Sequence, residues 1–152
     1  MKHYRIILML VLIIGVFLCC YREGNATEST ERWTPYGQSE MGIFYYNNKS
    51  VKNIKPEIID VLTKIKYSKL GKEKTIQARK DYELSVDGWE KLDYCRKVYE
   101  IDCINNTSKL IKKKECNIEG KTLAGFEPNP TAELILHNTI MEDLRKMVCT
   151  KQ

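Results

Sequence analysis

The clearest helical pattern in the first half of the chain covers residues 55–68. Its apolar side chains recur at the spacing of one helix face: Ile58, Val61, Leu62 and Ile65. Lysines and carboxylates fill the opposite positions, and Pro56 stands at a favourable first helical position. The pattern predicts an amphipathic helix over 55–68.

Between residues 82 and 103 the apolar period changes to that of a strand. Tyr82, Leu84 and Val86 alternate with polar residues, and Asp87-Gly88 is typical of a two-residue hairpin turn. In the run that follows, alternate residues fall on one strand side: Cys95, Lys97, Tyr99, Ile101 and Cys103. This predicts an antiparallel hairpin, and a helix over 89–99 is the competing interpretation.

A second helix is predicted near the C-terminus. Asn129-Pro130 matches an N-cap followed by a first helical residue. An apolar stripe then follows: Leu134, Ile140, Met141, Leu144 and Val148. The sequence therefore predicts an α+β fold, a small disulfide-bonded domain with two helices and a short antiparallel sheet. A mostly helical bundle is the alternative, which applies if residues 75–103 are helical.

The first 26 residues have the pattern of a secretory signal peptide. A basic start precedes an apolar run from Ile6 to Leu18, and small residues follow up to Ala26. As a helix, that run rises about 20 Å, which is short of the roughly 30 Å hydrocarbon core that a membrane anchor must cross. We expect cleavage after Ala26, and an uncleaved anchor is the alternative.

The remainder divides into two predicted parts. Residues 27–54 are polar, with breakers and a group of aromatic residues, and predict an irregular N-terminal arm with a short strand near 42–46. The rings are expected to pack as a lid on the core, and a binding surface is the alternative. Residues 55–152 form the predicted compact domain.

Export changes what the cysteines and asparagines can do. Four cysteines remain after cleavage in an oxidising compartment, and an even number fits two disulfides: Cys95, Cys103, Cys116 and Cys149. Three pairings stay open. Three asparagines lie in glycosylation sequons: Asn48, Asn105 and Asn106. These features predict a secreted glycoprotein.

Net charge argues against nucleic acid as a partner. The formal charge of +5 falls to about +3 when the signal removes three cations (Lys2, Arg5, Arg22) and Glu23. An excess of this size favours solubility. The lysine run within 109–114 is expected to be a solvated loop or edge strand, and a heparin-like or phosphate partner is the alternative.

Candidate chemistry is sparse. Outside the signal the only histidine is His137, and no nucleophile elbow, phosphate-binding glycine loop, paired-cysteine motif or calcium loop accompanies it. Glu100 and Asp102 would share one strand face, beside Arg96 and Lys97, which a mixed-charge exposed surface explains. We therefore expect no catalytic residue, no metal site and no cofactor, so the protein is not expected to be an enzyme.

The function that remains is binding. We expect an extracellular binding or effector protein that acts through protein–protein contacts with a receptor or other partner, without nucleic acid and without a membrane after signal cleavage. The order of elements over residues 55–152 also resembles the secreted cystatins. In that comparison Leu84-Ser85-Val86-Asp87-Gly88 stands where those inhibitors carry a Q-x-V-x-G hairpin, with Leu84 in place of the glutamine. The resemblance implies inhibition of papain-like proteases.

Overall fold

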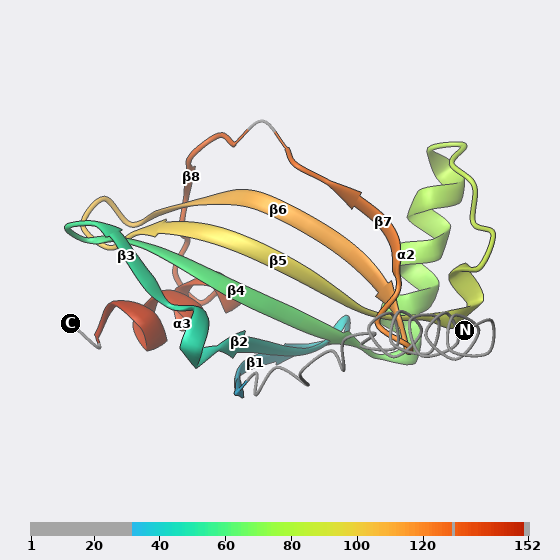
Figure 1. Ribbon diagram of the computed structural model, residues 1–152, viewed down its shortest axis with the longest axis horizontal. Coiled ribbons are helices and arrows are strands. Elements are labelled where there is room, and N and C mark those ends of the chain that lie inside the picture. Colours follow the sequence, from blue (N-terminus) through green and yellow to red (C-terminus); the bar gives the residue numbers. More distant parts are fainter. Residues whose placement is uncertain (1–31, 129, 151–152) are drawn as a thin grey trace, which may run out of the picture. The chain divides into compact units, whose positions relative to one another are not determined.

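The computed structural model describes residues 32–128 and 130–150. Within these ranges the chain forms one antiparallel sheet of eight strands and two α-helices (Figure 1). The strands are β1 (Trp33–Ser39), β2 (Gly42–Asn47), β3 (Lys52–Lys55), β4 (Ile58–Tyr67), β5 (Leu92–Asp102), β6 (Thr107–Asn117), β7 (Thr122–Phe126) and β8 (Glu133–Leu134). The helices are α2 (Lys69–Asp81) and α3 (Ile140–Cys149), with short 3-10 turns η1 (Asn48–Ser50) and η2 (Trp89–Lys91).

Three long strands form the middle of the sheet. The order is β1-β2-β4-β5-β6-β7, while β3 pairs with the other end of β4 and β8 with the other end of β6. The predicted α+β domain with a short sheet is therefore wrong, and so is the helical bundle. The sheet is the main body of the domain, and the helices are short additions to it.

Residues 58–67 are a strand, not the predicted helix. In β4 the alternate residues Ile59, Val61, Thr63, Ile65 and Tyr67 are all buried. The helical spacing of the apolar residues was real, but the segment is rich in β-branched side chains, which lose rotamer freedom in a helix and pack well on a pleated surface. The helix begins only at Lys69, where the Ser68 hydroxyl accepts a hydrogen bond from the Gly71 N–H.

The N-terminal region and the predicted hairpin also differ from expectation. Residues 33–55 contribute β1, β2 and β3, so the sheet continues across the boundary that was expected at residue 54. The expected short strand near 42–46 is present as β2. Residues 82–88 form no strand; they connect α2 to η2, with Gly88 in the left-handed conformation at the start of η2. The second predicted strand is confirmed as β5, which excludes the helix over 89–99.

The C-terminal helix starts later than predicted. The N-cap is Thr139, whose hydroxyl accepts a hydrogen bond from the Glu142 N–H at 3.2 Å, while the Glu142 carboxylate accepts one from the Asn138 N–H at 2.8 Å. This reciprocal arrangement is close to a capping box. The hydrogen bond from the Asn138 N–H, with His137 and Lys146 beside the carboxylate, lowers the pKa of Glu142 to about 2. Leu134, expected on the helix stripe, lies instead in β8.

Within the described residues, both buried apolar clusters lie on one face of the sheet. We call it the inner face, defined by Ile59, Val61, Thr63, Ile65 and Tyr67 of β4. At one end α3 covers it, through Leu144 and Val148. At the other end α2 and η2 cover it, through Ile76 and Trp89. The two helices lie at opposite ends of the long strands (Figure 1), so the core consists of two separate apolar clusters.

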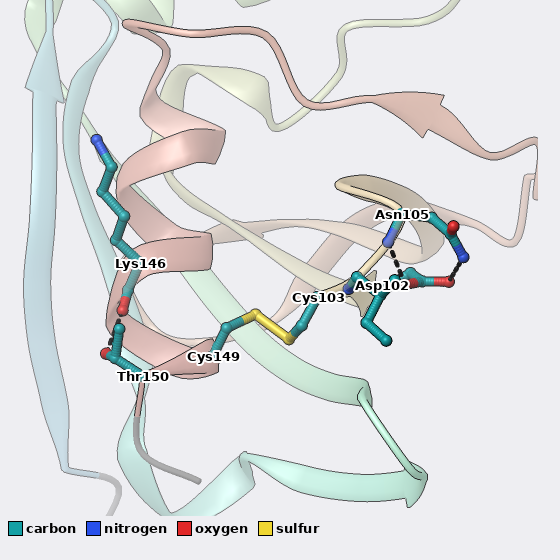
Figure 2. Close-up of a disulfide and its surroundings, with 7 residues drawn as sticks. Asp102, Cys103, Asn105, Lys146, Cys149 and Thr150 are labelled. Atoms are coloured by element: carbon teal, nitrogen blue, oxygen red, sulfur yellow. Dashed lines mark hydrogen bonds between the residues drawn. A yellow bond between two sulfur atoms is a disulfide. The ribbon is translucent and has the colours of Figure 1, made fainter.

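A disulfide fixes α3 to the sheet. Cys149 in the last turn of α3 bonds to Cys103, which directly follows β5 (Figure 2). In the turn between β5 and β6 that contains Cys103, the Asp102 carboxylate accepts hydrogen bonds from the Ile104 and Asn105 N–H groups. The bridge therefore joins the end of α3 to the ordered turn between β5 and β6.

Cys95 and Cys116 remain free thiols, and both are buried. In the ladder Cys95 is opposite Glu115, whereas Cys116 is opposite Tyr94. Residues that are directly opposite share a face, so the two thiols lie on different faces of the sheet and cannot bond. Burial raises the pKa of the Cys95 thiol to about 12, so it stays protonated at neutral pH.

The predicted signal peptide over 1–26 lies outside the described residues. Among those described, neither helix has the length and apolar character needed to cross a lipid bilayer.

Reducing the disulfide should destabilise the domain. The bridge closes a sequence separation of 46 residues, and the chain-entropy model gives such a loop a stabilisation of about 4 kcal/mol. We expect reductant to lower the melting temperature by more than about 10 °C. In the Cys103→Ser/Cys149→Ser variant the melting temperature should already be low and should not respond to reductant. Equal melting curves for the oxidised and reduced native protein would contradict a stabilising bridge.

Candidate binding groove on the inner face

Between its two covered ends the inner face is only partly covered, because Lys97 and Lys113 are half-buried there whereas Thr63 is fully buried. The middle row of the ladder there is Thr63, Lys97 and Lys113, on β4, β5 and β6. Next to this row, toward α2, lies a groove of about 750 Å³. Ligand sites commonly occupy about 300–1,000 Å³, so the groove is of the right size for a small molecule or a few side chains of a partner.

Apolar side chains make up most of the groove wall. The sheet contributes one wall and α2 with its following loop contributes the other. The apolar lining residues are Met41, Phe44, Ile65, Tyr67, Ala78, Tyr82, Leu84, Trp89, Ala124 and Phe126. Three of them are strongly exposed, Tyr82 at 78%, Leu84 at 50% and Phe126 at 52%. Exposed rings and aliphatic side chains beside a groove are typical of interaction sites.

A buried polar cluster lies on the sheet side of the groove. The Tyr67 hydroxyl donates a hydrogen bond to the Glu115 carboxylate at 3.0 Å, and Lys113 Nζ lies 2.9 Å from the same carboxylate. Desolvation pulls the pKa of Lys113 down, but the neighbouring Glu115 carboxylate outweighs it and the pKa is raised. Burial, together with Cys95 and Glu115, raises the pKa of Tyr67, so its hydroxyl stays a donor. The cluster is internally satisfied.

Lys97 is different from Lys113. It lines the groove, and no described carboxylate lies within ion-pair distance of its ammonium group. Its Nζ is 6.0 Å from the Tyr99 ring centroid. Lys97 also lines a second hollow of about 220 Å³ next to α3. Phe44 and Ile65 line both this hollow and the groove. Lys97 is therefore the cation that a bound acid can reach without displacing an internal partner.

Two further cations border the groove on the α2 side. The Arg79 guanidinium lies 4.4 Å from the Trp89 ring centroid and donates a hydrogen bond to the Ser85 carbonyl. Lys74 pairs with Glu40. The Arg79 contacts hold α2 against the loop that follows it, and the Lys74 pair connects α2 to the turn between β1 and β2.

The predicted disulfide and glycosylation residues are dispersed. Cys103 and Cys149 are bonded, whereas Cys95 and Cys116 are not. The sequon asparagines lie in turns: Asn48 in η1, and Asn105 and Asn106 between β5 and β6. None of these residues lines the groove.

The lysine run is divided by the pleat of β6. Lys109 pairs with Glu100 at 2.6 Å and Lys112 pairs with Glu127, whereas Lys113 faces inward to Glu115. Lys114 faces the opposite side. The run therefore lies in a strand, and its cations are divided between the two faces of the sheet and do not form one patch.

The residues weighed for catalysis have other roles. Glu100 pairs with Lys109, and Asp102 caps the turn after β5. His137 precedes α3, exposed, with Nδ1 3.1 Å from Glu142. Among the described residues no three His, Cys, Asp or Glu side chains are grouped closely enough to hold a metal ion.

The sequence correctly predicted that Lys97 lies on the same strand side as Cys95 and Tyr99. It did not predict that α2 and Lys113 lie beside these residues. The usable signal was the alternation of Lys113 with Glu115 in β6, since two ionisable residues at inward positions indicate a polar site within a core. That signal depends on assigning β6 as a central strand.

No protein-family model matches the chain, and no curated protein matches it significantly in sequence. Among solved structures it is similar to the crystal structure of protein E from non-typeable Haemophilus influenzae, with a TM-score of 0.49 and 9% identity over 84% of this chain and 81% of that one. A second structure of Haemophilus influenzae protein E gives a TM-score of 0.48 and 13% identity over 80% of this chain and 92% of that one. At these identities the similarity concerns the path of the backbone.

Two lysine variants should separate the structural cation from the available one. Lys113→Met leaves the buried Glu115 carboxylate without its cation, which should lower the free energy of unfolding by about 2–3 kcal/mol. Lys97→Met removes no described ion pair and should cost less than about 1 kcal/mol. Urea unfolding at neutral pH measures both. Equal losses for the two variants would be inconsistent with these assignments.

The two adjacent sequons should differ in use. The Asn106 side chain donates a hydrogen bond to the Ile135 carbonyl at 2.9 Å and is half-buried, whereas Asn105 is exposed. When the chain is secreted from a eukaryotic host, we expect glycan on Asn105 and little on Asn106, as measured by glycopeptide mass spectrometry. Predominant occupancy of Asn106 would contradict this expectation, because the side chain that bonds the Ile135 carbonyl would then carry the glycan.

Proposed function

We propose that the protein acts outside the cell as a binding protein that works through protein–protein contacts. Its groove would receive a segment of the partner that carries apolar side chains next to a carboxylate. One observation carries the proposal: an apolar groove of about 750 Å³ contains a lysine, Lys97, with no described carboxylate partner.

The apolar part of the proposal rests on the exposed side chains around the groove. Tyr82 and Leu84 lie on the loop after α2, and Phe126 ends β7 on the other side. Burying such side chains against a partner contributes roughly 25 cal/mol for each Å² removed from water. Aromatic anchors in a groove are also the usual centres of binding energy at protein interfaces.

The acidic part rests on charge complementarity. Lys97 lies in the groove, and Lys74 and Arg79 border it, while Glu115 is already engaged by Lys113 and Tyr67. A partner carboxylate that meets Lys97 in a partly desolvated groove forms a charge-assisted hydrogen bond, which is stronger than a neutral one. A basic or purely apolar partner segment would leave this cation unsatisfied.

The extracellular part rests on the Cys103–Cys149 disulfide together with the N-terminal pattern. Stable disulfides belong to oxidising compartments. Removal of a signal peptide over 1–26 and glycosylation of exposed Asn105 complete this proposal, because both require passage through the secretory route.

The protease-inhibitor hypothesis lacks a comparable observation. It required a β-hairpin at Leu84–Gly88, and that segment is the connection between α2 and η2. Leu84 lines the groove from this connection. Cystatin-like inhibition therefore stays a prediction without a structural wedge to support it.

Peptide selection tests the binding function. Random twelve-residue peptides displayed on phage are selected against the oxidised protein, and enriched peptides are then measured by fluorescence anisotropy. We expect sequences in which aromatic or aliphatic residues flank Asp or Glu. Ala78→Trp fills the groove from α2 and should weaken binding at least tenfold, and Lys97→Glu should do the same through charge repulsion.

Gln77→Trp is the matched control, since it adds the same ring at the helix position just before Ala78, and that position does not line the groove. Its affinity should stay within about twofold of wild type, because surface substitutions away from a site usually change free energies by less than about 0.5 kcal/mol. Peptides that bind the Ala78→Trp variant as tightly as wild type, or a selection without enrichment, would remove the groove as the binding site.

A further inference from the structure

The small hollow next to α3 extends the groove past Lys97. Phe44, Ile65 and Lys97 line both spaces, so the hollow and the groove lie next to each other with Lys97 between them. The Lys97 ammonium group lies 6.0 Å from the ring centroid of Tyr99, which lines the hollow and not the groove. A ligand in the groove can therefore reach past this cation into a second apolar space.

The hollow ends where α3 begins. Its wall on that side is formed by Thr139, Ile140 and Met141. β1 and α3 approach each other closely here, because a Cβ atom at Gly37 would lie only 2.8 Å from Ile140 Cδ1. Further along the same face, the buried side chains of α3 cover the sheet. A chain that lies along the groove thus has room for a side chain past Lys97, but no path along the sheet beyond it.

The hollow offers an acidic group several hydrogen-bond donors. The phenols Tyr36 and Tyr99 line it together with Lys97. The Tyr99 hydroxyl is close enough to interact electrostatically with the Tyr36 hydroxyl and with the Lys113 ammonium group. Burial and the neighbouring Tyr99 raise the pKa of Tyr36, so its hydroxyl stays protonated at neutral pH. A carboxylate beside Lys97 would therefore meet an ammonium group and neutral hydroxyls.

The carboxylates of the surrounding elements are already engaged. Glu115 on β6 is paired with Lys113. Glu142, in the first turn of α3, accepts a hydrogen bond from the Asn138 N–H and pairs with Lys146, and it lines neither space. Neither carboxylate therefore competes with a ligand for the ammonium group between the groove and the hollow.

We propose that this site recognises the C-terminal end of a partner polypeptide, with the terminal carboxylate on Lys97 and the last side chain in the hollow. At a chain end the carboxylate stands between the last side chain and the preceding residues, which matches a cation with a hollow on one side and a groove on the other. The apolar walls of the hollow, Tyr36, Phe44 and Ile65, favour an aliphatic last residue. The inference deepens the proposed function and rests on it, because it names the part of the partner that enters the same groove.

A comparison of free and blocked peptide ends tests the proposal. Random twelve-residue peptides are displayed in two libraries, one with free C-termini and one followed by a fixed spacer, and both are selected against the oxidised protein. An enriched peptide from the first library is synthesised as the free acid and as the C-terminal amide, and both are measured by fluorescence anisotropy. We expect peptides that end in Val, Leu, Ile or Met.

The amide should bind about tenfold more weakly than the acid, because it cannot form the charge-assisted hydrogen bond to Lys97. In the Lys97→Met variant the acid and the amide should bind about equally.

Met141→Trp fills the hollow from α3 and should weaken binding of the free acid about tenfold. Met147→Trp is the matched control, since it makes the same change on the same helix at a position that lines neither space. Binding by this control should stay within about twofold of wild type. If Met141→Trp does not fold, the last residue of the peptide is replaced by glycine, and about the same loss is expected with the wild-type protein.

The outcomes separate this inference from the proposed function. Equal affinities of the acid and the amide would overturn the inference, and the proposed function would stand if Ala78→Trp still weakens both. Displacement of the peptide by an equal concentration of dodecanoate would assign the site to a lipid chain and would also overturn the inference. Absence of enrichment from both libraries would remove the groove as a binding site, and the inference with it.

Discussion

The structure depends on a mismatch in length between the sheet and the helices that cover it. The long strands have 10 or 11 residues and extend about 35 Å, whereas a ten-residue helix such as α3 is about 15 Å long. Each helix covers one end of the inner face, so the middle row cannot be entirely apolar. Thr63, Lys97 and Lys113 occupy that row. The groove with its available lysine follows from this incomplete cover.

The two faces of the sheet consequently have different properties. The inner face has two apolar clusters, a satisfied buried ion pair and one lysine that a ligand can reach. The outer face has no covering helix among the described elements and carries cations held by rings. The Cys103–Cys149 bridge keeps α3 on the inner face, and the Ser68 cap and the Arg79–Trp89 contact order α2. The groove therefore lies between the strands of the sheet and an anchored helix.

The sequence could predict an element only where the pattern that specifies it lies within a short stretch of the chain. The β5 strand is predicted correctly because its alternation is strict. The β4 strand is missed because Ile58, Val61, Leu62 and Ile65 match a helical spacing and fall on both faces of the strand. The β-branched residues of this segment are the better evidence. The predicted helix start at Asn129-Pro130 is wrong, because the pair that caps α3 is Thr139–Glu142, which matches a capping box. The groove was not predictable, since it joins α2 to residues on β2, β5, β6 and β7. The pairing of the cysteines was not predictable either, because it depends on strand register.

Thiol accessibility along the inner face is the most direct test of the central claim. Single cysteines are introduced at Val61, Lys97 and Leu92 in a Cys95→Ser/Cys116→Ser background that keeps the disulfide, and maleimide labelling is followed under native conditions. The account predicts rapid labelling at position 97 and protection at positions 61 and 92, which belong to the two apolar clusters. Protection at position 97 equal to that at 61 and 92 would show that the inner face is fully covered and would contradict the account.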